Sequence, residues 1–223
     1  MNLNLDRRTR FVLFTMLFSV VSVLNAIFHG GWLPATVTSF IVFGLYLLYI
    51  GYYRDSLLGR LLLFGIAAGS VELLADCWST RLGWLVYFPG GPFVMCSPVY
   101  MPVGWAILMV QLGYLGWLFD QSWGLSKAML LTALIGAVNI PVYEYLAKSS
   151  RLWYYQNVPM LFQTVPYAVI FAEGLICLVL PPVIRLVTKH RWGWSILLGL
   201  AEGCWMWGVG VIGYWLFGTT LVK

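Results

Sequence analysis

Seven apolar runs, each long enough to cross a lipid bilayer, constrain this chain more than any other feature of its sequence. They lie near residues 11–28, 33–53, 57–78, 98–119, 126–147, 161–186 and 193–217. A helix needs about 20 apolar residues to cross a bilayer, because the hydrocarbon core is about 30 Å thick and each residue adds about 1.5 Å. The sequence therefore predicts an all-α, polytopic membrane protein. We expect seven transmembrane helices in a single integral-membrane domain over residues 1–223.

The composition excludes the soluble classes of protein. Only 9% of the 223 residues are charged and 61% are hydrophobic, whereas about 25% of an ordinary soluble chain is charged. The net charge of +5 lies in short flanks of the apolar runs and forms no basic face, which argues against a nucleic-acid partner. Arginines precede the first run, as in a signal peptide, but the run continues to Phe28 without a small-x-small cleavage site. We therefore expect this run to be retained as the first helix.

The positions of the 13 Lys and Arg residues predict the orientation, because positively charged flanks stay on the cytoplasmic side. A cytoplasmic N-terminus puts nine of them inside and four outside. The inner set is Arg7, Arg8, Arg10, Arg54, Arg60, Lys127, Arg185, Lys189 and Arg191, and the outer set is Arg81, Lys148, Arg151 and Lys223. The C-terminus and the loops 79–97 and 148–160 then lie outside. The expected location is a multi-pass position in a bacterial inner membrane or the endoplasmic reticulum.

The four cysteines show no CxxC or Cys/His spacing, so the sequence predicts neither a zinc site nor a redox motif. The favoured interpretation is that all four are small apolar packing residues. The alternative is that Cys77 and Cys96 meet outside the membrane.

Five acidic residues fall within the apolar runs, and no Lys or Arg lies in the interior of a run. They are Glu72, Asp76, Glu144, Glu173 and Glu202. An ionisable side chain in hydrocarbon costs several kcal/mol, so each is a candidate for function. Without a cationic partner burial disfavours the carboxylate, and we expect these carboxyls to keep their proton at neutral pH. A buried protonated carboxyl can act as an acid in an apolar site.

Glycine spacing indicates which acids face into the bundle. Glu72 lies three residues after Gly69, and Glu202 lies three residues after Gly199. Small residues at such spacing mark the close-packed face of a membrane helix, so both acids are expected to point inward. Asp76 lies one turn beyond Glu72. The alternative for each is a structural hydrogen bond between helices.

Two further acids are candidates with competing interpretations. Glu144 and Lys148 are spaced i, i+4, and the favoured interpretation is an ion pair at the outer end of the helix, with a functional role for Glu144 as the alternative. Glu173 fits a structural or a catalytic role equally. Asn25, Gln111 and Asn139 are interpreted as structural hydrogen-bond partners.

Aromatic residues make up 17% of the chain, more on the outer side than an interfacial belt requires. Aromatic faces stabilise cations, especially where water is excluded. An acid inside aromatic walls suits carbocation chemistry, in which a proton starts the cation and ring faces stabilise it. The expected substrate-binding residues are Trp78, Trp84, Tyr87, Tyr100, Trp105, Tyr143, Trp153, Tyr154, Tyr167 and Trp205.

The segment 83–102 is too apolar for a free external loop and too rich in Gly and Pro for a helix. We expect it to dip into the membrane or to cap the bundle as a lid; a plain interfacial loop is the alternative.

Several catalytic motifs do not occur in the sequence. It contains no DDxxD or NDxxD run for magnesium diphosphate, no HExxH and no Gly-x-Ser-x-Gly. We therefore expect no metal and no cofactor.

The chain resembles the small seven-helix integral-membrane terpene cyclases of meroterpenoid and indole-terpenoid pathways. The resemblance rests on length, helix count and two acids: Glu72 in Glu-Leu-Leu-Ala-Asp76 and Glu202 in Ala-Glu-Gly-Cys-Trp205. In that family the acid of the last helix is often Asp. The resemblance implies that these two acids protonate a polyprenyl olefin or epoxide without metal. A weaker likeness, through Pro141-Val-Tyr-Glu144, is to membrane carotenoid cyclases and hydratases.

The expected function is thus a metal-independent membrane terpene cyclase. Glu72 or Glu202 is the expected general acid, and Asp76, Glu144 or Glu173 orients groups or takes the last proton. The expected partners are a hydrophobic polyprenyl or isoprenoid substrate and membrane lipids. The alternatives are a carotenoid-type hydratase or cyclase, a proton-coupled small-molecule transporter, and a non-enzymatic membrane assembly or lipid-binding factor.

Overall fold

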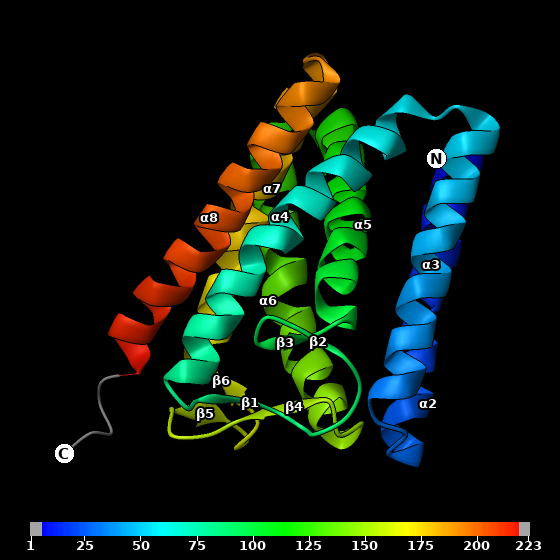
Figure 1. The fold of residues 1–223 in the computed structure, drawn as a ribbon. Coiled ribbons are helices and arrows are strands. Elements are labelled where there is room, and N and C mark those ends of the chain that lie inside the picture. The colour runs from blue at the N-terminus through cyan, green and yellow to red at the C-terminus, as the bar shows by residue number, and fades with distance from the viewer. Residues whose placement is uncertain (1–5, 219–223) are drawn as a thin grey trace.

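The computed structural model describes residues 6–218, which are mostly helical (Figure 1). Residues 1–5 and 219–223, among them Lys223 of the orientation argument, lie outside this range. The helices are α1 (Arg7–Leu17), α2 (Ser19–Phe28), α3 (Trp32–Tyr53), α4 (Ser56–Arg81), α5 (Tyr100–Trp123), α6 (Leu125–Ser149), α7 (Tyr167–Lys189) and α8 (Trp192–Phe217). Because α1 and α2 follow each other directly, they form one segment, and seven segments in the described range are long and apolar enough to cross a membrane. The predicted seven-helix architecture is confirmed at this level.

Local side-chain chemistry explains where several helices begin and end. The Asp55 side chain accepts hydrogen bonds from the backbone N–H groups of Leu57 and Leu58 and so caps the start of α4. Arg54 ends α3 in a left-handed conformation with φ 51°. Gly124, with φ 82°, separates α5 from α6, as glycine can without strain.

One predicted helix start is wrong by a whole hairpin, and two others differ from the structure by a few residues. Residues 161–166, expected at the start of a helix, belong instead to a hairpin of β5 (Met160–Leu161) and β6 (Val165–Pro166), and α7 begins at Tyr167. Phe162 and Gln163 in its turn have φ 51° and 54°, which a right-handed helix excludes. Residues 98–99 likewise precede α5, and the first segment begins at Arg7 rather than 11.

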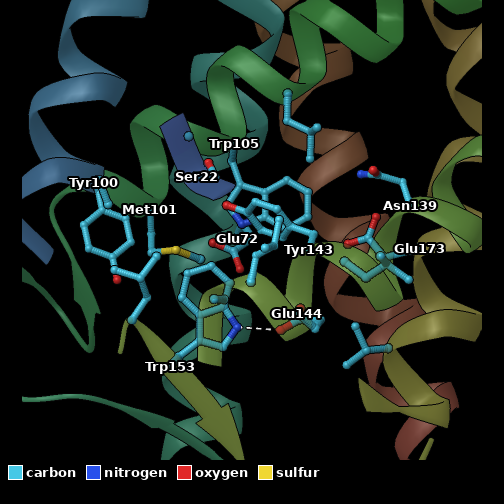
Figure 2. A pocket seen from close by; sticks show the side chains of 18 of the residues that line it. Ser22, Glu72, Tyr100, Met101, Trp105, Asn139, Tyr143, Glu144, Trp153 and Glu173 are labelled. Atoms are coloured by element: carbon cyan, nitrogen blue, oxygen red, sulfur yellow. Dashed lines mark hydrogen bonds between the residues drawn. The ribbon is translucent and has the colours of Figure 1, made fainter. Parts of the chain in front are cut away.

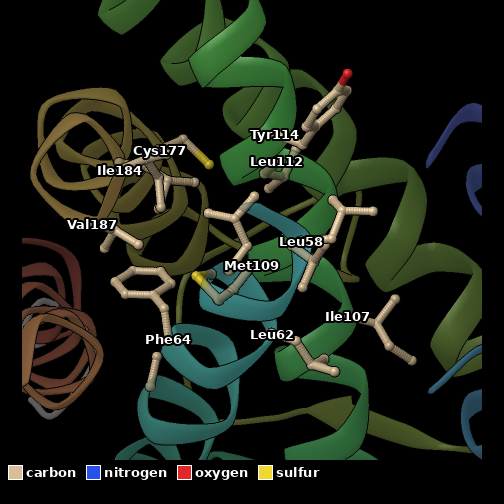
Figure 3. Close-up of a cluster of buried hydrophobic side chains, with 14 of the residues drawn as sticks. Leu58, Leu62, Phe64, Ile107, Met109, Leu112, Tyr114, Cys177, Ile184 and Val187 are labelled. Carbon is tan, nitrogen blue, oxygen red and sulfur yellow. The ribbon is translucent and has the colours of Figure 1, made fainter. Parts of the chain in front are cut away.

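Helix α4 lies at the centre of the bundle, packed against α5 on one side and α8 on the other, while α7 packs on α6 and α8. Helices α2 and α3 form a layer set to one side of the bundle (Figure 1). The main hydrophobic core occupies one half of the bundle, where Leu58, Phe64, Met109, Ile184 and Val187 interdigitate (Figure 3). The site described below borders this core, and Ile107, Ile176 and Met206 belong to both.

Short strands cover one end of the bundle (Figure 1). The antiparallel strands β1 (Leu85–Tyr87) and β4 (Trp153–Tyr155) join the two long loops, and β2 (Phe93–Val94) pairs with β3 (Ser97–Pro98). We call residues 82–99 and 150–166 the cap. Trp84 and Leu85 are buried, so the segment 83–102 caps the bundle, which was one of its expected arrangements.

A disulfide between Cys77 and Cys96 ties the end of α4 to the cap, with 4.9 Å between the two Cα atoms. The favoured interpretation of four packing cysteines is therefore wrong for this pair. The β2–β3 turn carries Cys96 back to α4, which no local spacing indicates. Cys177 is free and buried, as a packing residue would be, and Cys204 is free and exposed.

Candidate functional site

A cavity of about 560 Å³ lies between the α1–α3 segment, the bundle and the cap. All eight helices contribute to its wall, because the α2–α3 layer stands off from the bundle and faces the inner sides of α5 and α6 (Figures 1 and 2). The cavity reaches from the cap past the middle of α5. It therefore brings together side chains that are distant in the sequence.

Four of the five predicted acids line this cavity. Glu72 and Asp76 come from α4, Glu144 from α6 and Glu173 from α7, and each is buried with an exposed fraction of 5–8%. None of the described lining residues is Lys, Arg or His, so no cation is at hand to neutralise a carboxylate. Residues 6–218 also contain no group of three His, Cys, Asp or Glu side chains placed to hold a metal ion.

Asp76 is held by the cap. The Tyr87 hydroxyl and the Ser97 Oγ both donate hydrogen bonds to its Oδ2, and the Ser97 bond is 2.6 Å long. Burial raises the pKa of the Tyr87 hydroxyl well above its ordinary 10.0, with the nearby Asp76 acting in the same direction, so this hydroxyl remains a donor. Asp76 is thus a carboxyl with a fixed orientation.

Glu144 is held by the second loop of the cap. The Trp153 Nε1–H donates to Glu144 Oε2 at 2.6 Å (Figure 2), and the Tyr155 hydroxyl donates to Oε1 at 3.2 Å. The favoured interpretation of Glu144, an ion pair with Lys148, is wrong: Lys148 Nζ donates instead to the Gln163 carbonyl at 3.1 Å. The cap turns Glu144 inward, whereas Lys148 lies one helical turn further on, towards the β5–β6 hairpin.

Glu72 and Glu173 are less restrained. The Oε2 atom of Glu72 is buried and has no hydrogen-bond partner within the described part of the chain. Figure 2 shows Trp105 next to Glu72 and the Asn139 amide facing Glu173. A carboxyl oxygen with no protein partner is available to a bound molecule, because a buried polar atom is normally hydrogen-bonded.

Glu202 is buried, with an exposed fraction of 3%, but it does not line the cavity. It lies on α8 between Gly199 and Gly203, at the closest approach of α8 to α4. The expectation that Glu72 and Glu202 point into the bundle is therefore confirmed. The two acids differ in that Glu72 lines the cavity, whereas on α8 the lining begins at Met206, one helical turn beyond Glu202.

Aromatic rings form much of the cavity wall around these acids. Of the ten predicted residues, Trp78, Trp84, Tyr87, Tyr100, Trp105, Tyr143 and Trp153 line it, and Tyr154, Tyr167 and Trp205 do not. The Trp153 ring is central: its centroid lies 5.7 Å from that of Tyr143 and 6.2 Å from that of Tyr87. Outside the cavity, Tyr154 contacts Phe88, Tyr167 is exposed, and Trp205 donates to the Leu175 carbonyl.

Sequence reasoning missed three lining aromatics, Phe18, Tyr155 and Trp207. Residues 153–155 form strand β4, and successive side chains of a strand point to opposite faces. Trp153 and Tyr155 therefore face Glu144, whereas Tyr154 faces away. Strand alternation after α6 is the signal that would have identified Tyr155.

Uncharged polar groups line the opposite wall, on the α1–α3 segment and the facing part of α5. The Gln111 amide donates to Thr15 Oγ1 at 3.3 Å, and Thr15 also shares a 2.8 Å hydrogen bond with Tyr46. Asn25, Ser22 and Ser39 line the same wall. The three amides interpreted as structural, Asn25, Gln111 and Asn139, all line the cavity. The site thus combines an acidic, aromatic side with a neutral, hydrogen-bonding side.

Comparison with known proteins gives one family match. Residues 73–217 match the family described as Domain of unknown function (DUF6989), and the chain belongs to that family. The matched range contains Asp76, Glu144, Glu173 and Glu202, and it begins one residue after Glu72. No curated protein and no solved structure matches the chain.

Proposed function

We propose that this chain is a metal-independent membrane terpene cyclase, which protonates an olefin or epoxide of a polyprenyl-bearing lipid and folds the resulting carbocation into rings. The observation that carries the proposal is the set of four buried carboxyls around one aromatic-walled cavity without a cationic lining residue. A diphosphate substrate would need cations or metal at this wall. A neutral prenyl chain needs an acid, aromatic faces and the exclusion of water.

The geometry assigns different roles to the four acids. Glu72 is the general acid, since it lines the cavity and its buried Oε2 has no protein partner among the described residues; the Oε1 atom of Glu202 is likewise buried without a partner, but Glu202 does not line the cavity. Asp76 and Glu144 are oriented by two donors each. They, or Glu173 on the other side of the cavity, accept the last proton. General acids and bases typically contribute about 10²- to 10⁴-fold each.

The proton balance of the reaction is closed. The acid's O–H bond breaks and a C–H bond forms at an olefin carbon, or the epoxide C–O bond opens to an alcohol. Ring closure moves the cation along the chain, where the faces of Trp105, Tyr143 and Trp153 stabilise it. Loss of a proton to a second cavity carboxyl, which accepts it in its carboxylate form, restores an alkene, and the return of that proton to Glu72 resets the site. The product is an isomer of the substrate.

The proposed orientation puts the N-terminus in the cytoplasm and the cap outside. The distribution of Lys and Arg supports it. The Cys77–Cys96 disulfide supports it as well, because disulfides persist in oxidising compartments such as the periplasm or the lumen of the endoplasmic reticulum. The expected location is a multi-pass position in one of the two corresponding membranes.

The resemblance to membrane terpene cyclases supports the reaction class but implicates Glu202 as well as Glu72. Glu202 lies outside the cavity lining, so it is the residue on which the resemblance and the geometry differ. The geometry predicts that Glu202→Gln keeps activity and that Glu72→Gln loses it.

The test compares lipid extracts from cells that express wild type, Glu72→Gln or Glu202→Gln and are fed a panel of polyprenylated and epoxidised prenyl acceptors. Glu202→Gln is the matched control, because it makes the same chemical change at a buried acid that does not line the cavity. We expect a new product of unchanged mass from wild type and Glu202→Gln, and at least about 100-fold less from Glu72→Gln. A product heavier by one water indicates a hydratase. If no substrate gives a product and a pH gradient drives uptake of a substrate instead, the protein is a transporter and not a cyclase.

A further inference from the structure

The disulfide lies directly beside one of the hydrogen bonds that hold Asp76. Cys77 follows Asp76 in α4, and Cys96 precedes Ser97 in the cap. The Ser97 Oγ donates to Asp76 Oδ2 at 2.6 Å. The covalent bond and the hydrogen bond therefore join the same two segments at adjacent residues.

The β2–β3 hairpin has little else to hold it on α4. It consists of two residue pairs, Phe93 with Pro98 and Val94 with Ser97, and a Val99 N–H to Pro92 carbonyl bond closes it. Two-stranded hairpins are at best marginally stable without further packing. Phe93 and Val94 are exposed, whereas Ser97 is fully buried. The packed part of the hairpin is thus the part next to the disulfide.

The remaining ties of the first cap loop lie elsewhere along it. Strand β1 is paired with β4. The Trp32 ring at the start of α3 packs on Gly90 and Gly91, where a Cβ atom on Gly91 would lie 2.6 Å from the ring. Both ties precede the hairpin in the chain; Phe93 also contacts the Tyr87 ring, with 6.2 Å between centroids, and α5, which packs on α4, begins at Tyr100 just after the hairpin. Among the described residues, the disulfide is the one covalent link between the hairpin and α4.

We propose that the Cys77–Cys96 disulfide is a positioning element of the site, which holds the Ser97 hydroxyl on Asp76 and so orients that carboxyl in the cavity. The effect of this orientation on catalysis rests on the proposed function, whereas the orientation of Asp76 itself does not. Without the disulfide, we expect the hairpin to move away from α4, so that Asp76 loses the hydrogen bond from Ser97 and keeps its contacts with Tyr87 and with the neighbouring Glu72. Ser97 and the two cysteines are positioning residues, since they act through Asp76.

The proposal predicts that the disulfide and Ser97 act through one path, which a double-mutant cycle measures. The variants are Ser97→Ala, Cys77→Ala/Cys96→Ala and the triple variant, with Cys204→Ala as the matched control at an exposed free cysteine. The readout is the infrared carboxyl stretch of Asp76 in protein labelled with ¹³C-aspartate, assigned by Asp76→Asn. This band reports hydrogen bonding to Asp76 and requires no substrate.

We expect the same band shift in Ser97→Ala, in the cysteine variant and in the triple variant, and no shift in Cys204→Ala. Where product is formed, its rate falls about two- to tenfold in all three, the effect of one hydrogen bond. An unshifted band in a folded, disulfide-free protein overturns the proposal, as does an additive shift in the triple variant. If wild type forms no product, the proposed function is rejected but the positioning role is not, because the infrared band tests that role without a substrate.

A second measurement tests the proposal even if the cysteine variant does not fold. Folded wild type in detergent is treated with a water-soluble phosphine, which breaks the S–S bond, leaves two thiols and becomes a phosphine oxide with oxygen from water. The proposal predicts the Ser97→Ala band shift on reduction of wild type and no further shift on reduction of Ser97→Ala. An unchanged band in reduced wild type contradicts it.

Discussion

A single methyl group at Gly199 is expected to push α8 away from α4. An added Cβ atom would lie 2.8 Å from Ala67 Cβ and would also meet the Phe64 carbonyl oxygen. At Gly203 the added atom would lie 2.5 Å from Val71 Cβ. Carbon atoms do not approach this closely, so the helices must separate or bend. Overpacking of a tight interface typically costs about 1–3 kcal/mol, and we expect Gly199→Ala to lose stability in that range.

The assay is thermal denaturation in detergent, followed by the fraction of protein that stays monodisperse after heating. For a chain of this size a loss of 1 kcal/mol lowers the Tm by about 2–4 °C, so the expected decrease is about 2–12 °C. Gly208→Ala on the same helix is the control, because its added Cβ meets open space and alanine favours a helix by up to about 1 kcal/mol. A Gly199→Ala protein as stable as Gly208→Ala would refute the close contact between α4 and α8.

Two further predictions concern the cap. Trp153→Phe removes the donor of the 2.6 Å hydrogen bond to Glu144 and leaves a buried oxygen unpaired, which costs about 1–3 kcal/mol. The same thermal assay should show a smaller loss of stability for Tyr155→Phe, because the hydrogen bond from Tyr155 is 3.2 Å long. Equal losses for the two variants would contradict this geometry. Burial raises the pKa of the Tyr87 and Tyr155 hydroxyls well above 10.0. Their contribution to stability is therefore complete below about pH 10 and is lost as the pH rises further. Ultraviolet titration should show tyrosines that ionise only on unfolding, and full titration of the folded protein near pH 10 would rule this out.

The helices could be predicted from the sequence, because apolar runs of membrane length have few alternatives. The cap could not. Met160, Leu161 and Val165 are as apolar as the helix that follows them, so an average over about 19 residues includes them in the span. Their hairpin depends on the left-handed backbone at Phe162 and Gln163. Such a conformation is decided by tertiary contacts rather than by hydropathy.

The acids of the site could be predicted as buried, because charge is rare in these runs. Their partners could not. Pairing of β1 with β4 joins two loops far apart in the sequence and turns Trp153 towards Glu144 and Tyr154 away from it. The absence of Glu202 from the cavity lining depends on how deep the cavity reaches along α8, since Met206, one turn further on the same face, lines it. Neither arrangement follows from local spacing.

The most direct test of the central claim is the isotope content of the product formed in D₂O by purified protein in lipid, with an unepoxidised polyprenyl acceptor as substrate. If a carboxyl of the cavity protonates the olefin, wild type should form an isomer with one deuterium on carbon, and Glu72→Gln should form at least about 100-fold less. An epoxide substrate should give an isomeric ring alcohol with no deuterium on carbon. An isomer of the olefin substrate without deuterium, or equal rates for wild type and Glu72→Gln, would contradict the account.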